Sequence, residues 1–245
     1  MTWTFRIPRL PRSRVLGWGA AVLAVLALGM AAPAGLRRLT FFRVRQVELV
    51  GVRNLDPDVV LAALRLPRDA SVFDDTRLVA DRVRGLAGVA DARVVRRPPA
   101  VLKVIVREVE PVALVPGAGL GLGGALVVVD AGGRPLPFDP TRAGLDLPLA
   151  QRADSDVVGV LARIQAFDPV LFQAIDAARG YGSEARGDVL LELGSDRVLL
   201  TRDAGPEVIQ AVVLVTRDLA AKARPYAELD ARYARQVVVR RRPSS

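Results

Sequence analysis

Acid–base chemistry in this 245-residue chain would have to rest on carboxylates, Lys or Tyr, because the sequence contains no Cys and no His. That composition excludes thiol nucleophiles, the usual zinc sites and Ser-His catalytic arrangements. Three acidic groupings could be drawn as catalytic pairs: Glu108 with Glu110, Asp74 with Asp75, and Asp154 with Asp156. Each has a simpler interpretation as a solvated strand face, a helix cap or a loop. We therefore expect no catalytic residue, no metal site and no cofactor.

The net charge of +9 is concentrated at the two ends of the chain. Residues 1–45 carry eight Arg and no acid, and residues 240–242 are all Arg. The span between them, residues 46–239, has 24 basic and 26 acidic side chains. A nucleic-acid-binding protein should concentrate its basic charge on a folded face. We therefore expect no nucleic-acid partner and no small-molecule substrate, and the basic ends suit a membrane-anchored protein better.

Residues 15–36 form an uncharged stretch of 22 residues. At about 1.5 Å per residue, a helix of that length crosses the ~30 Å hydrocarbon core of a bilayer. The stretch predicts a single transmembrane helix after a short tail, residues 1–14. A cleaved signal peptide is the alternative, because residues 32–34 read Ala-Pro-Ala, but the apolar stretch is longer than a signal peptide requires. The predicted membrane-spanning side chains include Val15, Leu16, Trp18, Val22, Leu23, Val25, Leu26, Leu28, Met30 and Leu36.

The orientation of this helix does not follow from flanking charge alone, since both flanks carry four Arg. Long domains translocate largely regardless of charge. We therefore expect the N-terminus in the cytoplasm and residues 37–245 outside, in the periplasm or an equivalent extracytoplasmic space.

Residues 42–113 predict a first outer domain of the α+β class. An apolar strand ends at Gly51, and Asp56 followed by Pro57 is typical of a helix start. A second helix should begin near Asp74 or Asp75 and run toward Gly88. Residues 93–113 then alternate apolar and charged side chains around a Pro-Pro pair, which predicts a hairpin. The expected order is β-α-α-β-β.

Residues 114–242 predict a second, mixed β domain with flanking helices. We interpret residues 116–124, which contain five glycines, as a flexible linker between the domains. Residues 126–136 read as strand, Gly turn and strand, and a helix follows from about residue 157 to 167. Residues 189–193 and 198–201 flank a second turn, Pro206 opens a helix that reaches about residue 223, and residues 235–240 form the last strand.

Three stretches of this sequence resemble the bacterial cell-division proteins of the FtsQ/DivIB family. Residues 97–106 read Arg-Pro-Pro-x-x-Leu-x-Val-x-Val, and residues 47–51 are similar to the family's first strand. Residues 229–233, Leu-Asp-Ala-Arg-Tyr, resemble its closing segment. The resemblance runs from the predicted anchor to the last ten residues, and it implies a POTRA domain followed by the family's β domain. POTRA domains also occur in outer-membrane assembly and secretion proteins.

The resemblance further implies binding rather than catalysis. An extended segment of FtsB, which forms a coiled coil with FtsL, would add as a strand beside the last strand, and the final helix would wall the site. We expect both faces of that strand to be covered, Tyr233 to be an aromatic anchor and Arg232 to contact an acidic partner segment. The alternative is that Arg232 and Tyr233 only tie the sheet end to its domain. The predicted partner-binding residues are Arg232, Tyr233, Arg235, Gln236, Val237, Val238, Val239, Val212 and Val215.

The resulting prediction is a non-enzymatic, single-pass scaffold of the inner membrane at the division septum. It would gather FtsB, FtsL and, through them, the septal peptidoglycan synthase. One alternative is a POTRA-type docking or chaperone module of an outer-membrane assembly or secretion system. A second is a membrane-anchored cell-wall hydrolase, which would need an acid/base pair clustered in a cleft.

Overall fold

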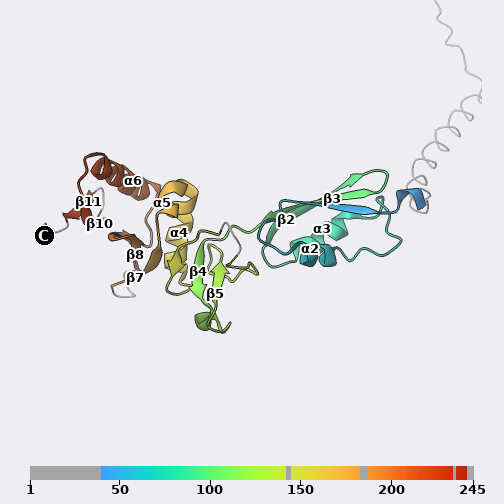
Figure 1. The fold of residues 1–245 in the computed structure, drawn as a ribbon, viewed down its shortest axis with the longest axis horizontal. Helices are drawn as coiled ribbons and strands as arrows, with labels where there is room; N and C mark the ends of the chain where they lie inside the picture. The colour runs from blue at the N-terminus through green and yellow to red at the C-terminus, as the bar shows by residue number, and fades with distance from the viewer. Residues whose placement is uncertain (1–39, 142–144, 183–186, 234–235, 242–245) are drawn as a thin grey trace, which may run out of the picture.

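The computed structural model describes residues 40–141, 145–182, 187–233 and 236–241 (Figure 1). The predicted cytoplasmic tail, residues 1–14, and the predicted membrane helix, residues 15–36, lie outside these ranges, as does Arg235. Among the residues that are described, no helix has both the length and the apolar character needed to cross a bilayer.

The first domain follows a one-turn 3-10 helix, η1 (Thr40–Phe42). Its elements are β1 (Gln46–Val50), α2 (Pro57–Leu64), α3 (Thr76–Arg84), β2 (Val89–Arg97) and β3 (Val101–Glu108). The predicted β-α-α-β-β order is therefore confirmed. β3 is the central strand and pairs parallel with β1 and antiparallel with β2, so the sheet order is β1-β3-β2.

Capping carboxylates determine where both helices of this domain begin. Asp56 accepts a 2.9 Å hydrogen bond from the Asp58 amide, and Pro57 occupies the first helical position of α2. Asp75 caps α3 in the same way, through the Arg77 amide. The helices bury Val60 and Val83 in one hydrophobic core with strand residue Val104.

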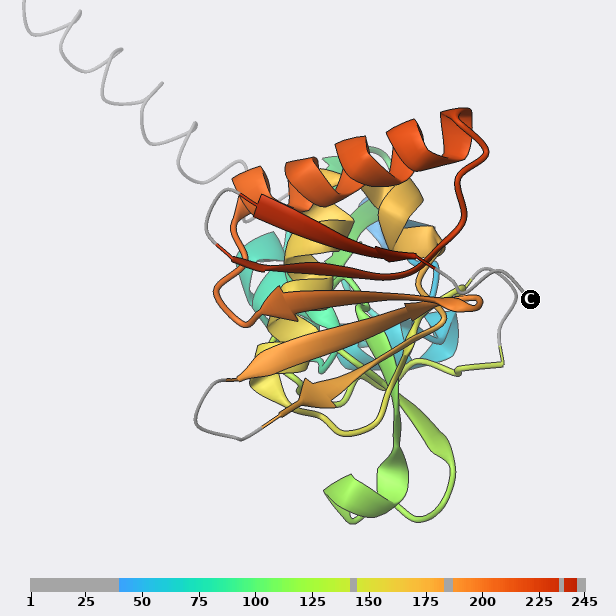
Figure 2. The ribbon, with the colours of Figure 1, turned by 90° about the vertical axis from the view of Figure 1, so that its left-hand side faces the viewer.

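The second domain is built on one eight-stranded mixed sheet with the order β11-β10-β9-β8-β7-β6-β4-β5. Figure 2 shows α6 running alongside β10 and β11, with α4 behind the central strands. Both helices contribute to its core, where Leu161, Leu191 and Ile209 are fully buried. The elements are β4 (Ala113–Pro116), η2 (Gly117–Leu120), β5 (Leu126–Val129), β6 (Leu149–Ala150), α4 (Ser155–Phe167), α5 (Pro169–Gln173), β7 (Ala177–Tyr181), β8 (Asp188–Leu193), β9 (Asp196–Thr201), α6 (Pro206–Ala221), β10 (Tyr226–Tyr233) and β11 (Gln236–Arg241).

The interpretation of the glycine-rich run as an interdomain linker is wrong. β4 already belongs to the second sheet, and it pairs antiparallel with β5 from Ala113↔Val129 to Pro116↔Leu126. The glycines between them form the long loop of a hairpin that projects from the domain (Figure 2). At Gly117 an added Cβ would lie 2.8 Å from the carbonyl oxygen of Ala125, so close approach of the two arms explains that glycine. The chain passes between the domains earlier, through residues 109–112.

A segment of the second domain packs into the core of the first. Leu136 and Phe138 are buried in the same cluster as Leu55 of the first domain. Gly88 makes room for them, because a Cβ there would lie 2.9 Å from Cε1 of Phe138. The two domains are thus joined by buried apolar contacts as well as by the connecting chain.

Candidate partner-binding edge

β11 is one edge of the eight-stranded sheet, as the sequence led us to expect for the last strand. It pairs antiparallel with β10, from Tyr226↔Arg241 through Asp230↔Val238 to Tyr233↔Gln236. No strand among the described residues pairs with its other side. Alternate backbone N–H and C=O groups of β11 therefore point away from the sheet and are available to a further strand.

The side chains of β11 are more exposed to solvent than predicted. Val237 packs against the domain core, but Val238 is 43% and Val239 36% exposed. The expectation that both faces of this strand are covered is therefore wrong. A run of three valines is typical of a strand buried on both sides, but here only the face that Val237 occupies meets the core.

Helix α6, the predicted wall of the site, presents fewer side chains to a partner than its apolar stripe suggested. Val212 is 1% exposed and packs in the domain core, so it is not available for partner contact in this conformation. Val215 is half-buried against the same core. The helical stripe marks the face that packs inward. The exposed large apolar side chain of α6 is Leu214, which lies off the stripe and was not among the predicted residues.

Arg232 is bound by two carboxylates of its own domain. Its guanidinium lies 2.7 Å from Asp188 on β8 and 2.7 Å from Asp230 on β10, and its Nε donates a further 2.8 Å bond to Asp230. Both carboxylates are almost fully buried, while the Arg232 side chain is 21% exposed. The guanidinium Cζ lies 5.8 Å from the centre of the Tyr181 ring.

These contacts stabilise the charged form of each partner. The hydrogen bond from Arg232 lowers the pKa of Asp230 below its ordinary value, against the opposing effect of burial. Hydrogen bonds to Asp230 and then Asp188 raise the pKa of Arg232. The geometry favours the interpretation that Arg232 ties β10 to β8. Asp188 is 44 positions from Arg232, so no local sequence signal indicated this pairing.

Tyr233, one residue further along, is placed quite differently. Its side chain is 53% exposed at the end of β10, opposite Gln236 of β11. Towards the other end of the same pair of strands, Arg240 lies 3.2 Å from Glu228. The described part of the predicted site is thus an open strand edge with an exposed aromatic ring, while Arg232 supports it from within.

Of the acidic residues considered for catalysis, all but the exposed Glu110 have structural partners. Asp74 accepts a hydrogen bond from the Ser71 amide, and Asp75 caps α3. Glu108 accepts hydrogen bonds of 2.8–3.0 Å from three successive amides, those of residues 53–55, which fastens the end of β3 to the loop before α2. No group of three or more potential metal ligands occurs among the described residues.

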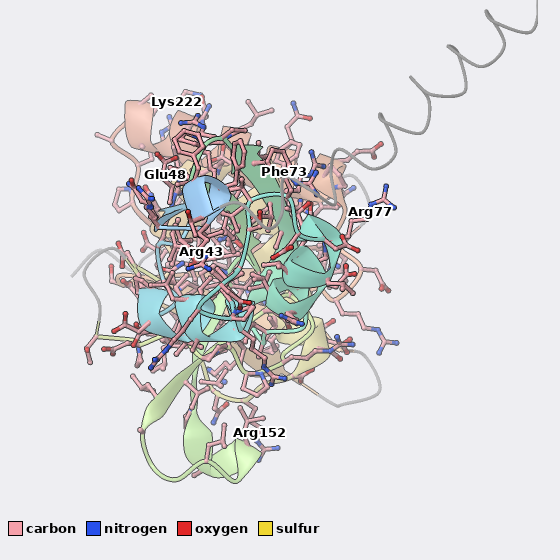
Figure 3. All side chains as sticks on the ribbon, turned by 90° about the vertical axis from the view of Figure 1, so that its right-hand side faces the viewer. Arg43, Glu48, Phe73, Arg77, Arg152 and Lys222 are labelled. Carbon is pink, nitrogen blue, oxygen red and sulfur yellow. The ribbon has the colours of Figure 1, made fainter. Side chains whose placement is uncertain are left out.

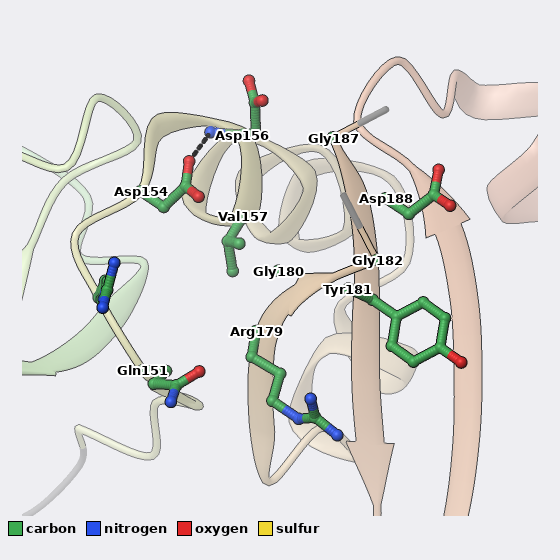
Figure 4. A pocket seen from close by; sticks show the side chains of 11 residues that line it. Gln151, Asp154, Asp156, Val157, Arg179, Gly180, Tyr181, Gly182, Gly187 and Asp188 are labelled. Atoms are coloured by element: carbon green, nitrogen blue, oxygen red, sulfur yellow. Dashed lines mark hydrogen bonds between the residues drawn. The ribbon is translucent and has the colours of Figure 1, made fainter. Parts of the chain in front are cut away.

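Asp154 and Asp156 line a pocket of about 400 Å³ on the second domain (Figure 4). Asp154 caps α4 by accepting a 2.9 Å bond from the Asp156 amide, and Asp156 lies 3.4 Å from Arg202. Asp188, on the far side of the pocket, belongs to the Arg232 cluster. The carboxylates around the pocket therefore cap a helix or form ion pairs.

The fold defines a protein in which a POTRA-type domain, two helices on a three-stranded sheet, precedes a larger mixed-sheet domain with an open edge. Residues 42–108 match the family described as "POTRA domain, FtsQ-type". In this region the chain is similar to the FtsQ/DivIB family of bacterial cell-division proteins.

Curated relatives extend this similarity beyond the POTRA domain. The chain is 35% identical over 148 residues to "Cell division protein FtsQ" of Anaeromyxobacter sp. (strain K), a match that covers 58% of this chain and 47% of the relative. It is 32% identical over 176 residues to the protein of the same name from Mycolicibacterium smegmatis, covering 64% of this chain and 51% of the relative. The matches thus span about half the length of these relatives, and a third, from Rhodothermus marinus, covers 31% of its relative.

Proposed function

We propose that this chain is a bacterial cell-division protein, a non-enzymatic, single-pass scaffold of the inner membrane that acts at the septum. Its N-terminus would lie in the cytoplasm and both described domains outside it. The similarity to proteins named FtsQ and the uncharged stretch at residues 15–36 support this topology. The structural roles of Glu108, Asp74, Asp75, Asp154 and Asp156 support the absence of catalysis.

The proposed mechanism is strand addition at β11. An extended segment of FtsB would pair with the outward backbone groups of β11, and FtsL would join through its coiled coil with FtsB. Main-chain hydrogen bonds supply the affinity in this binding mode, and side-chain pockets supply the specificity. The septal peptidoglycan synthase would then be recruited and regulated indirectly.

The observation that carries the proposal is that β11 is an edge strand with exposed Val238, Val239 and neighbouring Tyr233. Exposed aromatic side chains are enriched among the residues that dominate interfaces. Arg232 is already neutralised by two carboxylates, so its part in the site would be to hold β10 in place. Arg240, at the exposed end of β11, would be the cation that meets an acidic partner segment.

Affinity capture from solubilised membranes tests this function. Wild-type chain should retain small bitopic coiled-coil proteins and the synthase, and Tyr233→Lys should lose them while remaining folded. Leu122→Lys is the matched control, because Leu122 is also 53% exposed but lies in the β4–β5 loop at the opposite edge. Retention of every partner by Tyr233→Lys would refute the site. Capture of outer-membrane assembly factors by the wild type would instead favour the docking-module alternative.

A further inference from the structure

Three phenylalanines gather at the end of the POTRA domain where the described chain begins. The rings of Phe41 and Phe42 are 5.1 Å apart at 80°, and those of Phe42 and Phe73 are 5.0 Å apart at 71°. Phe41 is 59% exposed. The cluster is held by main-chain bonds, because the Val72 amide donates to the Phe42 carbonyl at 2.9 Å and the Val44 amide to the Ala70 carbonyl at 2.8 Å. It is therefore part of the folded domain.

Exposed arginines surround these rings. Arg43 and Arg77 lie on the end of the domain that faces the viewer in Figure 3, together with Phe73. Arg45 is on the same end, since its amide bonds to the carbonyl of Ala100 at the tip of the β2–β3 hairpin. Arg96 reaches the same end, where it donates a 2.9 Å bond to the Asp74 carbonyl. We call these seven residues the aromatic–basic end: Phe41, Phe42, Phe73, Arg43, Arg45, Arg77 and Arg96.

Acidic side chains, among them Asp69, Asp74 and Asp75, also lie near this end, but three of its arginines are not paired with any of them. Glu48 lies 3.5 Å from Arg97, and Asp74 and Asp75 accept hydrogen bonds from backbone amides. Within the described ranges, Arg43, Arg45 and Arg77 take part in no ion pair. An aromatic cluster with one exposed ring, flanked by arginines without ion pairs, is typical of protein surfaces that lie in a membrane interface.

The position of this end along the chain identifies its ligand. Thr40 follows the predicted membrane span, which ends at Leu36, by four residues. We propose that the aromatic–basic end docks on an anionic phospholipid surface, with the phenylalanines at the level of the headgroups and the arginines against lipid phosphates. This inference goes beyond partner binding at β11, and it rests on the proposed membrane span and topology.

Docking of this kind would determine the height and orientation of β11 above the membrane. The second domain is joined to the POTRA domain by the buried residues Leu136 and Phe138. A POTRA domain oriented on the bilayer would therefore hold the second domain, and β11 with it, in a restricted range of heights and directions above the membrane.

The absence of Cys makes a direct depth measurement simple. The full-length chain, carrying a single nitroxide at Asp69→Cys, is placed in lipid nanodiscs of phosphatidylcholine, with or without phosphatidylglycerol. Asp69 is exposed and adjoins Ala70, whose carbonyl binds the η1–β1 segment. The control label is Asp203→Cys in the second domain, where the side chain is 90% exposed. The readout is the ratio of nitroxide collision rates with oxygen and with a water-soluble nickel chelate.

We expect that ratio at position 69 to rise several-fold when the anionic lipid is present, and the ratio at position 203 to stay constant. The rise should disappear in 1 M salt, where the screening length falls to about 3 Å. It should also disappear in the triple variant Arg43→Gln, Arg45→Gln, Arg77→Gln, and shrink in Phe41→Ser. The matched control is Arg134→Gln, Arg197→Gln, Arg224→Gln, which removes the same charge from exposed positions of the second domain.

A ratio at position 69 that ignores the anionic lipid, or that falls equally in the two triple variants, would overturn the proposal. A chain that fails to enter nanodiscs at all would overturn it together with the predicted span. A failure of lipid docking alone would leave partner capture by β11 unchanged, whereas failure to enter nanodiscs would also overturn the proposed single-pass topology, so the two failures are distinguishable.

Discussion

The two edges of the eight-stranded sheet differ: the β5 edge is covered by a following segment of the chain, and the β11 edge is unpaired among the described residues. At the β5 edge the chain folds back on itself: the Leu136 amide donates a 2.8 Å bond to the Val128 carbonyl, and Val129 forms a bridge with Pro135. Val128 and Val129 are fully buried. At the β11 edge no described segment covers the strand, and Val238 and Val239 are exposed.

The difference shows how one sheet can serve two purposes. The β5 edge is closed by a turn in which the Asp130 side chain accepts bonds from the amides of Gly132 and Arg134, and the residues after the turn pack into the POTRA core. That edge joins the domains. The β11 edge is instead protected from indiscriminate pairing by charge, since Arg240 and Arg241 lie on it. We interpret it as the edge kept for a specific partner.

The largest loss of stability should come from breaking the closed edge. Phe138→Ala removes a ring that is 5% exposed and leaves a cavity between the two domains, so it should lower the free energy of unfolding by about 3–5 kcal/mol. Urea unfolding followed by circular dichroism measures this loss. Phe167→Ala is the control, because Phe167 is 43% exposed and should cost much less. Equal losses in the two variants would contradict the packing role of Phe138.

The next largest effect is expected inside the open edge, at Arg232. Arg232→Gln leaves Asp188 and Asp230 buried without their cation, which should cost about 3 kcal/mol. Arg240→Gln removes an ion pair in which the arginine side chain is 66% exposed, so it should cost about 1 kcal/mol or less. Unfolding of both variants under one set of conditions tests the comparison. A loss at Arg240 as large as that at Arg232 would mean that burial of the cluster does not matter.

A smaller effect should appear as a dependence on acid. Because Arg232 lowers the pKa of Asp230 in the folded state, the unfolded chain binds a proton there at a higher pH than the folded chain does. The contribution of Asp230 is therefore fully present above the unfolded carboxyl pKa of about 3.9 and is lost as the pH falls through the folded-state value. Unfolding free energies measured between pH 2 and pH 6 should rise with pH in the wild type. Asp230→Asn should flatten that rise, whereas an unchanged slope would rule out this linkage.

The smallest effect on stability is expected at Tyr233, although its effect on binding should be large. Tyr233→Lys changes an exposed side chain, so the free energy of unfolding should move by about 0.5 kcal/mol or less. Thermal unfolding of Tyr233→Lys and Arg232→Gln, measured under the same conditions, tests this contrast between neighbouring residues. If Tyr233→Lys were as destabilising as Arg232→Gln, loss of partners in that variant would report unfolding instead of a lost contact.

Local signals predicted the secondary structure of this chain well, because they act within a few residues. Asp56, Asp75 and Asp154 each cap a helix that begins at the next residue. Pro206 starts α6. Glycine runs are less specific, since a hairpin loop and a linker both need backbone freedom, and the run at residues 116–124 was misplaced for that reason.

The candidate site was only partly predictable. The sequence identified the last strand and the aromatic residue before it, and the structure places them at an edge and on the surface. It could not separate the inward from the outward residues of α6, so Val212 was included although it is a core residue. Periodicity shows that a helix has an apolar face, but it does not show what that face packs against.

The sequence by itself determined the order of elements, the absence of thiol and imidazole chemistry, the uncharged stretch at residues 15–36 and the resemblance to a division-protein family. These depend on composition and on contacts between near neighbours. Only the tertiary structure decided that Arg232 is neutralised by Asp188, that residues 136–138 close one sheet edge and enter the POTRA core, and that β11 is left open. Each of these depends on residues brought together from distant parts of the chain, and such contacts are selected by packing of the whole fold.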